Sequence, residues 1–259
     1  MVRGGLTWVL IGYAVFEWGS DVSSDRSDVS GQLFDSDGSA AELVREICDW
    51  CVDVLAVDGA LVTVMSRGGG RVLLYASDAT AQELDDLQFS LGEGPCLSAF
   101  DDARPALQGD LASDAAHVRW PAFVGAAMDT GVMAAFAYPL LGAHHPVGTL
   151  ELYRRGAGEL DSGQLAGLGV AAARVTHALL ARRAEIVDGD EMAGISERSA
   201  GRIAVHCAAG MVSVQIGATV DQALSRLRAA AYVEDIPLAE LAHTVLRRAR
   251  RFQAELPRE

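Results

Sequence analysis

The 259-residue sequence contains no lysine and no asparagine, so all 21 of its basic residues are arginines. The absence of lysine excludes phosphate binding by a Walker A lysine, Schiff-base catalysis, and the lysine of a phosphoacceptor receiver domain. Cysteine is also scarce, and four thiols scattered over a chain of this length do not make a disulfide framework. This cysteine usage fits a reducing compartment, and we expect a cytoplasmic protein.

Positive charge is in deficit, because 35 acidic residues outnumber the 21 basic ones and give a net charge of −14. Attraction of the whole molecule to nucleic acid or to an anionic membrane is therefore not expected, although a local basic surface is compatible with this balance. Half of the residues are hydrophobic, which excludes a chain that is disordered throughout. The length fits one large domain or two smaller ones.

Residues 1–39 differ in composition from the rest of the chain. The apolar run from Leu6 to Phe16 is too short to cross a bilayer and has the length of a signal-peptide core. The segment after it is rich in Ser, Asp and Gly and has no clear cleavage site. A signal peptide is one interpretation, and a disordered arm or a start codon placed too early is the favoured one.

Residues 40–184 predict a single α+β domain. A helix should end near Leu55, a second should lie around residues 122–130, and a third should follow Asp161. The strands are expected at residues 60–65, 72–77, 133–141 and 147–153. Because turn residues separate the first two strands and also the last two, we expect two antiparallel hairpins. The order of elements favours an antiparallel sheet with helices on one face.

The helix after Asp161 carries apolar residues at alternating steps of three and four, which is the spacing of a coiled-coil seam. The seam residues are Leu165, Leu168, Ala172, Val175 and Leu179. We expect a homodimer through this helix; the alternative is that the helix packs on its own sheet. A Gly- and acid-rich stretch at 188–194 marks a domain boundary, so residues 185–196 are interpreted as a linker.

Residues 197–254 predict a module of three helices. Ile203, Cys207, Gly210 and Val214 mark the face of the first helix, and Gly217 closes it. Thr219 and Gln222 form a capping-box signature before the second helix, which should bury Val220, Ala223, Leu224, Leu227 and Ala231. The third helix should start at Pro237 and bury Leu238, Leu241, Val245 and Phe252.

Catalytic and metal-binding patterns are weak in this sequence. Cys48 and Cys51 have the spacing of a redox or metal pair, but they lie in a predicted helix and no second such pair exists. His144 and His145 fall in a predicted turn. Since no Gly-x-Ser-x-Gly elbow or fixed pair of acids is present either, we expect neither a metal site nor an enzyme.

The most distinctive local string runs from Gly92 to Leu97 and reads Gly-Glu-Gly-Pro-Cys-Leu. It places Cys96 at the start of a helix, where a thiol should have a lowered pKa and could be reactive. The alternative is a small buried residue in a tight loop. We expect the sheet to border an apolar ligand cavity lined by Tyr75, Cys96, Phe123 and Tyr138.

Two family resemblances follow from these strings. The Gly92 to Leu97 string, Asp110-Leu111 and Trp120-Pro121 resemble the GAF sensor domains of actinobacterial regulators over residues 40–184. The strings at 208–217 and 223–232, with Pro237-Leu238, resemble an ANTAR domain. The second resemblance implies a three-helix module, usually dimeric, that binds paired RNA stem-loops and prevents transcription termination. The sensed ligand or cofactor is unknown from the sequence.

The C-terminal part of the chain is near neutral, because residues 186–259 hold ten acids and nine arginines. Its basic residues gather on the second and third predicted helices. We expect RNA to contact outward-facing guanidinium groups and one aromatic ring, namely Arg226, Arg228, Tyr232, Arg247, Arg250 and Arg251. The alternative is that these arginines pair with Glu234, Asp235 and Glu240. A thiol enzyme reducing free methionine sulfoxide and a ligand-free dimerising scaffold are the competing functions.

Overall fold

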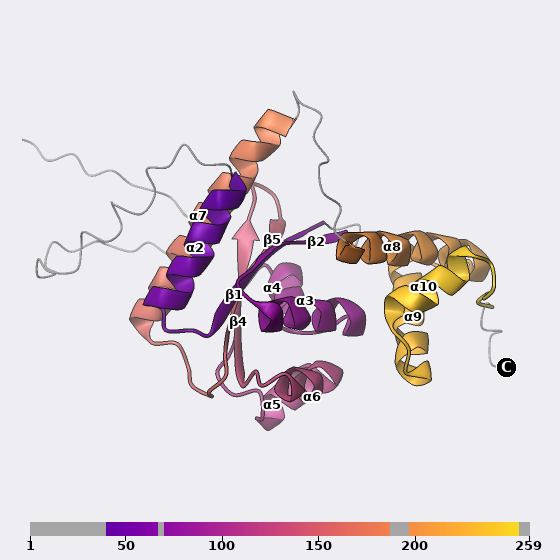
Figure 1. Ribbon diagram of the computed structural model, residues 1–259, viewed down its shortest axis with the longest axis horizontal. Coiled ribbons are helices and arrows are strands. Elements are labelled where there is room, and N and C mark those ends of the chain that lie inside the picture. The colour runs from indigo at the N-terminus through magenta and orange to yellow at the C-terminus, as the bar shows by residue number, and fades with distance from the viewer. Residues whose placement is uncertain (1–39, 67–69, 187–196, 254–259) are drawn as a thin grey trace, which may run out of the picture. The chain divides into compact units, whose positions relative to one another are not determined.

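The computed structural model describes residues 40–66, 70–186 and 197–253 (Figure 1). We call residues 40–186 the sheet domain and residues 197–253 the helical module. The described residues after position 38 belong to one compact unit. The predicted arm at 1–39 and the predicted domain boundary at 188–194 lie outside the described residues.

The sheet has five strands in the order β2-β1-β5-β4-β3, and all neighbouring strands run antiparallel. Its strands are β1 (Gly59–Met65), β2 (Arg71–Ala76), β3 (Ala106–Gln108), β4 (Ala134–Leu141) and β5 (Pro146–Arg154). Both predicted hairpins are confirmed, with Val62 opposite Tyr75 in the first and Tyr138 opposite Leu150 in the second. Strand β3 was not predicted, because three residues are too few to show a period.

Helices cover both faces of the sheet, so the expectation of helices on one face is wrong (Figure 1). The predicted first helix is confirmed as α2 (Ala40–Val54), which packs with α7 (Ser162–Ile186) on one face. The opposite face carries α3 (Ala79–Leu91), α4 (Pro95–Asp102), α5 (Asp114–Arg119) and α6 (Pro121–Asp129). The two faces follow from strand alternation: Ala137 joins the cluster around Trp120, next to α6, whereas Tyr138 lies against Gly169 of α7.

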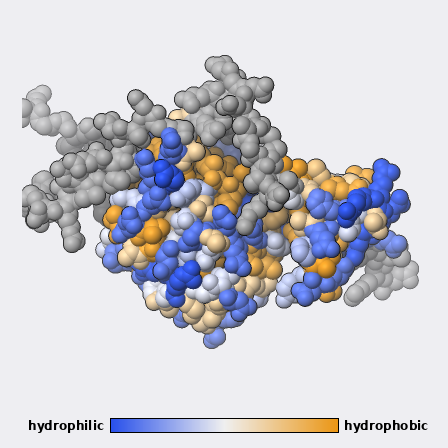
Figure 2. Space-filling view, in the orientation of Figure 1, coloured by the Kyte–Doolittle hydropathy of each residue, from blue (hydrophilic) through white to orange (hydrophobic). Residues whose placement is uncertain are grey.

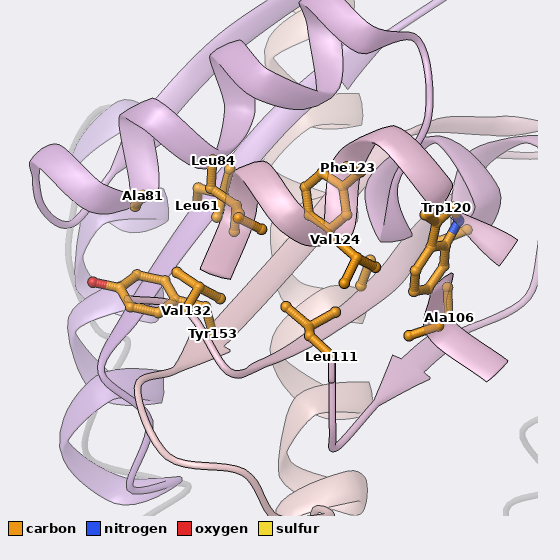
Figure 3. Close-up of a cluster of buried hydrophobic side chains, with 14 residues drawn as sticks. Leu61, Ala81, Leu84, Ala106, Leu111, Trp120, Phe123, Val124, Val132 and Tyr153 are labelled. Atoms are coloured by element: carbon orange, nitrogen blue, oxygen red, sulfur yellow. The ribbon is translucent and has the colours of Figure 1, made fainter. Parts of the chain in front are cut away.

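The core on the α3 to α6 face is apolar and closely packed (Figure 3). Trp120, which precedes α6, and Phe123 of α6 meet edge to face, with ring centroids 6.2 Å apart. Trp120 also donates a 2.9 Å hydrogen bond from Nε1 to the Ser98 hydroxyl on α4. Leu111, which precedes α5, is fully buried in the same cluster. This packing fixes α4 and α6 relative to the sheet.

The apolar face of α7 packs inside the chain. Leu168, Ala172 and Val175 are buried, and Leu165 and Leu179 are half-buried. The expected seam is therefore already occupied by α2 and the sheet, because steps of three and four also describe a helix that packs on a sheet. By length and composition alone, residues 162–181 of α7 could cross a membrane, and a bent pair formed by residues 201–216 and 220–234 passes the same test.

The helical module consists of α8 (Glu197–Ile216), α9 (Val220–Glu234) and α10 (Leu238–Leu246). The predicted capping box of α9 is confirmed, since Thr219 and Gln222 exchange hydrogen bonds of 3.2 and 3.0 Å. Gly217 follows α8 with a φ of 65°, a left-handed conformation that suits glycine at a helix end. The module core buries Ala223, Leu224, Leu227, Ala231, Leu238, Leu241 and Val245, as expected.

Three expectations about the module are wrong. Ile203 and Val214 are 49% and 83% exposed and Cys207 is exposed, so the buried face of α8 is instead formed by Ala204, Val205, Ala208, Ala209 and Val212. Three of these five residues are alanines, and the larger apolar residues beside them gave the wrong helix face in the sequence pattern. Val220 is also 42% exposed. Helix α10 ends at Leu246, and Phe252 packs on the module core from the segment after it.

Candidate functional site

The Gly92 to Leu97 string connects three helices on one face of the sheet. Gly92 ends α3 with a φ of 75°, and Gly94 precedes α4 with a φ of 135°. A Cβ at Gly94 would lie 2.6 Å from the Gln88 side chain, so only glycine fits there. Glu93 accepts hydrogen bonds of 2.5 and 2.8 Å from the backbone N–H groups of Ala122 and Phe123, and so caps the start of α6.

Cys96 is fully buried beside the sheet. Its Sγ lies 2.8 Å from the Thr149 hydroxyl and 3.9 Å from the Met65 sulfur, and Arg71 donates to it over 3.5 Å. Burial raises the pKa of Cys96 to about 12, although the Arg71 charge opposes this effect. The expectation of a lowered pKa is wrong, because desolvation outweighs the position at a helix start.

Asp85 of α3 lies at the centre of a buried ionic cluster. Its Oδ1 accepts hydrogen bonds from the Thr63 hydroxyl at 2.9 Å and from Arg71 Nη2 at 2.5 Å, while Oδ2 accepts from Arg202 Nη2 of α8. Burial alone would raise the pKa of Asp85, but the charges and hydrogen bonds of the two arginines hold it below its ordinary value. One carboxylate therefore joins the sheet to the helical module.

Gln88, one turn after Asp85, links Cys96 to a second buried acid. Its Oε1 accepts from the Cys96 backbone N–H at 2.8 Å, and its Nε2 donates to Glu151 Oε2 at 2.7 Å. Burial raises the pKa of Glu151 to about 7. Within the described residues, Glu151 Oε1 and Arg71 Nη1 are buried without a hydrogen-bond partner. The cluster therefore has a buried hydrogen-bond donor group and a buried acceptor that no described residue satisfies.

A pocket of about 710 Å³ opens beside this cluster. Met65 and Arg71 line it from the sheet, Leu97 and Phe100 from α4, and the side chain of Arg228 from α9. His144 and His145, both exposed, line it from the turn between β4 and β5. Apolar walls with a few charged groups are the ordinary make-up of a small-molecule site.

The four residues expected to line one ligand cavity do not lie together. Tyr75 donates a 2.8 Å hydrogen bond to Asp49 of α2, and Tyr138 faces α7. Phe123 is fully buried in the core on the opposite face, on the same side as Cys96. The expectation of a shared cavity is wrong because Tyr75 and Tyr138 lie on the other side of the sheet.

Phe89 of α3 reaches into the helical module and belongs to its buried core. The guanidinium groups of Arg202 and Arg228 lie 4.9 and 5.8 Å from its ring centroid, and His206 meets the ring edge at 5.9 Å. Arg228 also donates from Nε to the Phe89 carbonyl at 3.0 Å. Arg228 therefore faces the sheet domain, whereas the sequence led us to expect it on the outer surface.

The other expected RNA-contacting residues differ in exposure. Tyr232 is 69% exposed, and Arg247 and Arg251 are exposed, although they follow α10 and do not lie on it. Arg226 is half-buried. Arg250 forms a two-point ion pair with Glu234 at 2.6 and 2.5 Å, which is the alternative to RNA contact that the sequence offers for this residue. Figure 2 shows strongly hydrophilic side chains at the end of the module where α10 finishes.

The remaining candidates from the sequence are the two cysteines of α2 and a possible metal site. Cys48 and Cys51 are buried in α2, and burial raises the pKa of both, to about 12 for Cys51. Among the residues that the structure describes, no group of three or more His, Cys, Asp or Glu side chains is placed to hold a metal ion. Sequence reasoning missed four residues of the site, namely Arg71, Asp85, Gln88 and Glu151. The signal that could have found them is a polar residue at an inward-facing position of an otherwise apolar strand or helix.

An antiparallel sheet with helices on both faces and a buried polar cluster defines an α+β domain. Residues 38–179 match the family model described as GAF domain. This match spans more than half of the chain, so the chain belongs to the GAF domain family and the sheet domain is a GAF sensory domain. No curated protein sequence gives a significant match.

Similar solved structures include a domain assigned to a two-component sensor histidine kinase protein from Sinorhizobium meliloti 1021, with 16% identity over 58% of this chain and 96% of that chain and a TM-score of 0.46. A GAF domain from Synechocystis sp. PCC6803 in its photoproduct state has 18% identity over 58% and 100%, with a TM-score of 0.44. A type II free methionine-R-sulfoxide reductase from Thermoplasma acidophilum has 13% identity over 54% and 95%, with a TM-score of 0.39. Because these TM-scores are low, the family assignment rests on the sequence match.

Proposed function

We propose that this protein is a signal-responsive, cytoplasmic RNA-binding regulator that prevents transcription termination and acts as a homodimer without enzymatic activity. The GAF domain senses a signal, and the helical module, which resembles an ANTAR domain, binds stem-loop RNA. Because the chain as a whole is acidic, RNA would bind only at one local basic surface.

The observation that carries the RNA-binding part is the exposed surface at the end of α9 and α10. The Glu234 to Arg250 ion pair joins the C-terminal end of α9 to the segment after α10. Tyr232 therefore lies two residues from that junction, and Arg247 and Arg251 lie close to it in sequence, all three exposed. An exposed ring can stack on an unpaired base, and exposed guanidinium groups can grip phosphate.

The competing thiol-enzyme function is less consistent with the site. Reduction of a sulfoxide by a thiol needs a nucleophilic thiolate and a second thiol that resolves the intermediate. Cys96 is fully buried and burial raises its pKa to about 12, which disfavours the thiolate. The sulfur nearest to it within the described hydrogen-bond contacts is the thioether of Met65.

The test measures binding of a two-stem-loop RNA by the full chain over a range of salt concentrations. Replacing Arg247 and Arg251 with Ala should weaken binding and lower the logarithmic salt slope by roughly one unit for each phosphate group that the variant no longer binds. The matched control replaces Arg45 and Arg119, two exposed arginines of the GAF domain, with Ala. Unchanged affinity and slope in the first variant would remove this surface from the mechanism.

A further inference from the structure

Charged side chains gather where α3 meets the helical module. Three guanidinium groups gather there, from Arg71, Arg202 and Arg228. Arg71 and Arg202 share the carboxylate of Asp85, and Arg202 also reaches Asp86 at 2.7 Å. Within the described part of the chain, Arg228 forms no ion pair, and its Nε donates to a backbone carbonyl. The buried Glu151 also acts on Arg71, so Arg228 is the guanidinium group of this cluster for which the described residues supply no ion-pair partner.

The environment of Arg228 disfavours its positive charge. Burial and the nearby positive charge of Arg71 together lower its pKa to about 10, while the charge of Asp221 opposes this effect. Two like charges that share a partly desolvated space repel each other more strongly than they would in water. An anion between them would relieve that repulsion.

The space next to these two arginines is the 710 Å³ pocket. Arg71 and Arg228 both line it. The Arg71 side chain is only 3% exposed, and its Nη1 is buried with no hydrogen-bond partner among the described residues. Leu97, Phe100 and Leu224 supply apolar walls. The volume lies within the range of roughly 300 to 1,000 Å³ that is usual for small-ligand sites.

We propose that this pocket binds a small organic anion, a carboxylate or phosphate ester with an apolar body, whose charged group lies between the guanidinium groups of Arg71 and Arg228. The apolar body packs against Leu97, Phe100 and Leu224. Guanidinium groups suit this role because their planar N–H groups match the oxygens of carboxylates and phosphates.

The acidic residues of the pocket oppose this attraction only from exposed positions. Asp101 and Asp221 also line it, but both are exposed, so water and salt screen their charges. Arg71 is buried and Arg228 is half-buried, and charges in such positions are screened less. The interior of the pocket is therefore cationic and its rim is acidic.

This site goes beyond RNA binding and predicts how a signal reaches the helical module. A ligand in the pocket would touch β2 through Arg71 and α9 through Arg228, so its binding would favour the arrangement in which both arginines face it. The test measures ligand binding directly and does not depend on RNA. Its failure would thus leave the RNA-binding proposal untouched, and the reverse also holds.

The experiment titrates the full chain with four probes by calorimetry: phenyl phosphate, benzoate, inorganic phosphate and the neutral benzyl alcohol. We expect both aromatic anions to bind at least about tenfold more tightly than benzyl alcohol and than inorganic phosphate, because the site needs both charge and an apolar body. Equal binding of benzyl alcohol would overturn the anionic site. Equal binding of inorganic phosphate would overturn the organic character of the ligand.

Two variants test the residues. Arg228→Gln removes the charge, and Ser225→Glu adds a carboxylate to the lining while leaving the arginines in place. Both should weaken phenyl phosphate binding about tenfold or more, and Arg45→Gln on α2, across the sheet, should not change it. Because Ser225 is exposed, its variant should fold even if the Arg228 variant does not. Wild-type affinity in the Ser225 variant, or no anion binding by the wild type, would refute the proposal.

Discussion

Arg202 of α8 donates to the buried carboxylate of Asp85 on α3, so the first helix of the helical module is held to the GAF domain by an ion pair that water hardly reaches. The side chain of Arg202 is 7% exposed and that of Asp85 is fully buried. Such a pair is costly to break from one side, because the remaining charge loses its partner while it stays out of water. The contact is therefore suited to hold the two parts in a defined arrangement.

Replacing Arg202 with Gln should loosen α8 from the GAF domain. Asp85 keeps Arg71 as a partner, so the cost should be lower than for an isolated buried pair, about 1 to 3 kcal/mol. Hydrogen exchange of the backbone amides of α8 should become about tenfold faster or more, and that of α2 should stay unchanged. Arg45→Gln removes an equal charge from an exposed pair and serves as the control. Unchanged exchange in α8 would show that the pair does not hold the helix.

Replacing Glu93 with Ala should destabilise the GAF domain by about 1 to 2 kcal/mol, because the N–H groups of Ala122 and Phe123 lose their carboxylate acceptor. Chemical denaturation followed by tryptophan fluorescence measures this loss, since Trp120 lies next to the capped turn. Glu83→Ala on α3 removes an exposed carboxylate and should have little effect. A loss of equal size in both variants would contradict the capping role.

Glu151 should make the protein less stable as the pH rises. Its pKa is about 7 in the folded chain against an ordinary value of 4.5, so between these pH values the folded state holds a proton that the unfolded state has lost. The free energy of unfolding should therefore fall through this window, by about 3 kcal/mol in total if Glu151 acts alone. Glu151→Gln should flatten the fall, because a neutral amide does not titrate. A curve of unchanged slope would mean that Glu151 is ionised in the folded chain.

The four thiols should react at very different rates. Cys48, Cys51 and Cys96 are buried and burial raises the pKa of each, whereas Cys207 is exposed on α8. In the native protein, a disulfide reagent such as Ellman's reagent should label one thiol quickly and the other three only after unfolding. Cys207→Ser should abolish the fast reaction. Fast labelling in that variant would show that Cys96 or the α2 pair is accessible.

A homodimer through α7 would have to use its outer face. This face carries Val170 and Leu180, which are 53% and 40% exposed, at a spacing that places Ala166, Ala173 and His177 on the same stripe. We expect sedimentation to give a dimer at tens of micromolar, an order-of-magnitude range that suits weak dimers, and Val170→Glu to give a monomer. Val118→Glu on α5 is the control. A wild-type monomer would rule out the assembly.

Much of the fold could be predicted because apolar periodicity and turn residues carry it. The strands around Val62 and Tyr138 and the capping box at Thr219 appeared where the pattern placed them. Helix α3 did not, because Asp85 and Gln88 occupy inward positions and break its apolar stripe. The face of α8 was missed because alanines form much of it, beside Val205 and Val212.

The site was harder to predict than the fold, because it depends on contacts between residues far apart in the sequence. Nothing near Arg71 in the sequence indicates that it would meet Asp85 and Cys96, 14 and 25 residues away. Likewise, Arg228 was expected on the outer surface because its own helix left it outside the apolar stripe. Its inward direction is set by Phe89, 139 residues earlier.

The two oxygens of Asp85 serve different parts of the molecule, and this division has a consequence for natural variation. Oδ1 serves the sheet through Thr63 and Arg71, and Oδ2 serves α8 through Arg202. A carboxylate has two equivalent acceptors, whereas an amide has one acceptor and one donor. An asparagine at this position would have to turn its amino group toward one of two arginines, and so could keep the fold of the sensor or its grip on α8, but not both. Replacement of Asp85 by asparagine would therefore cost the protein one of these two contacts.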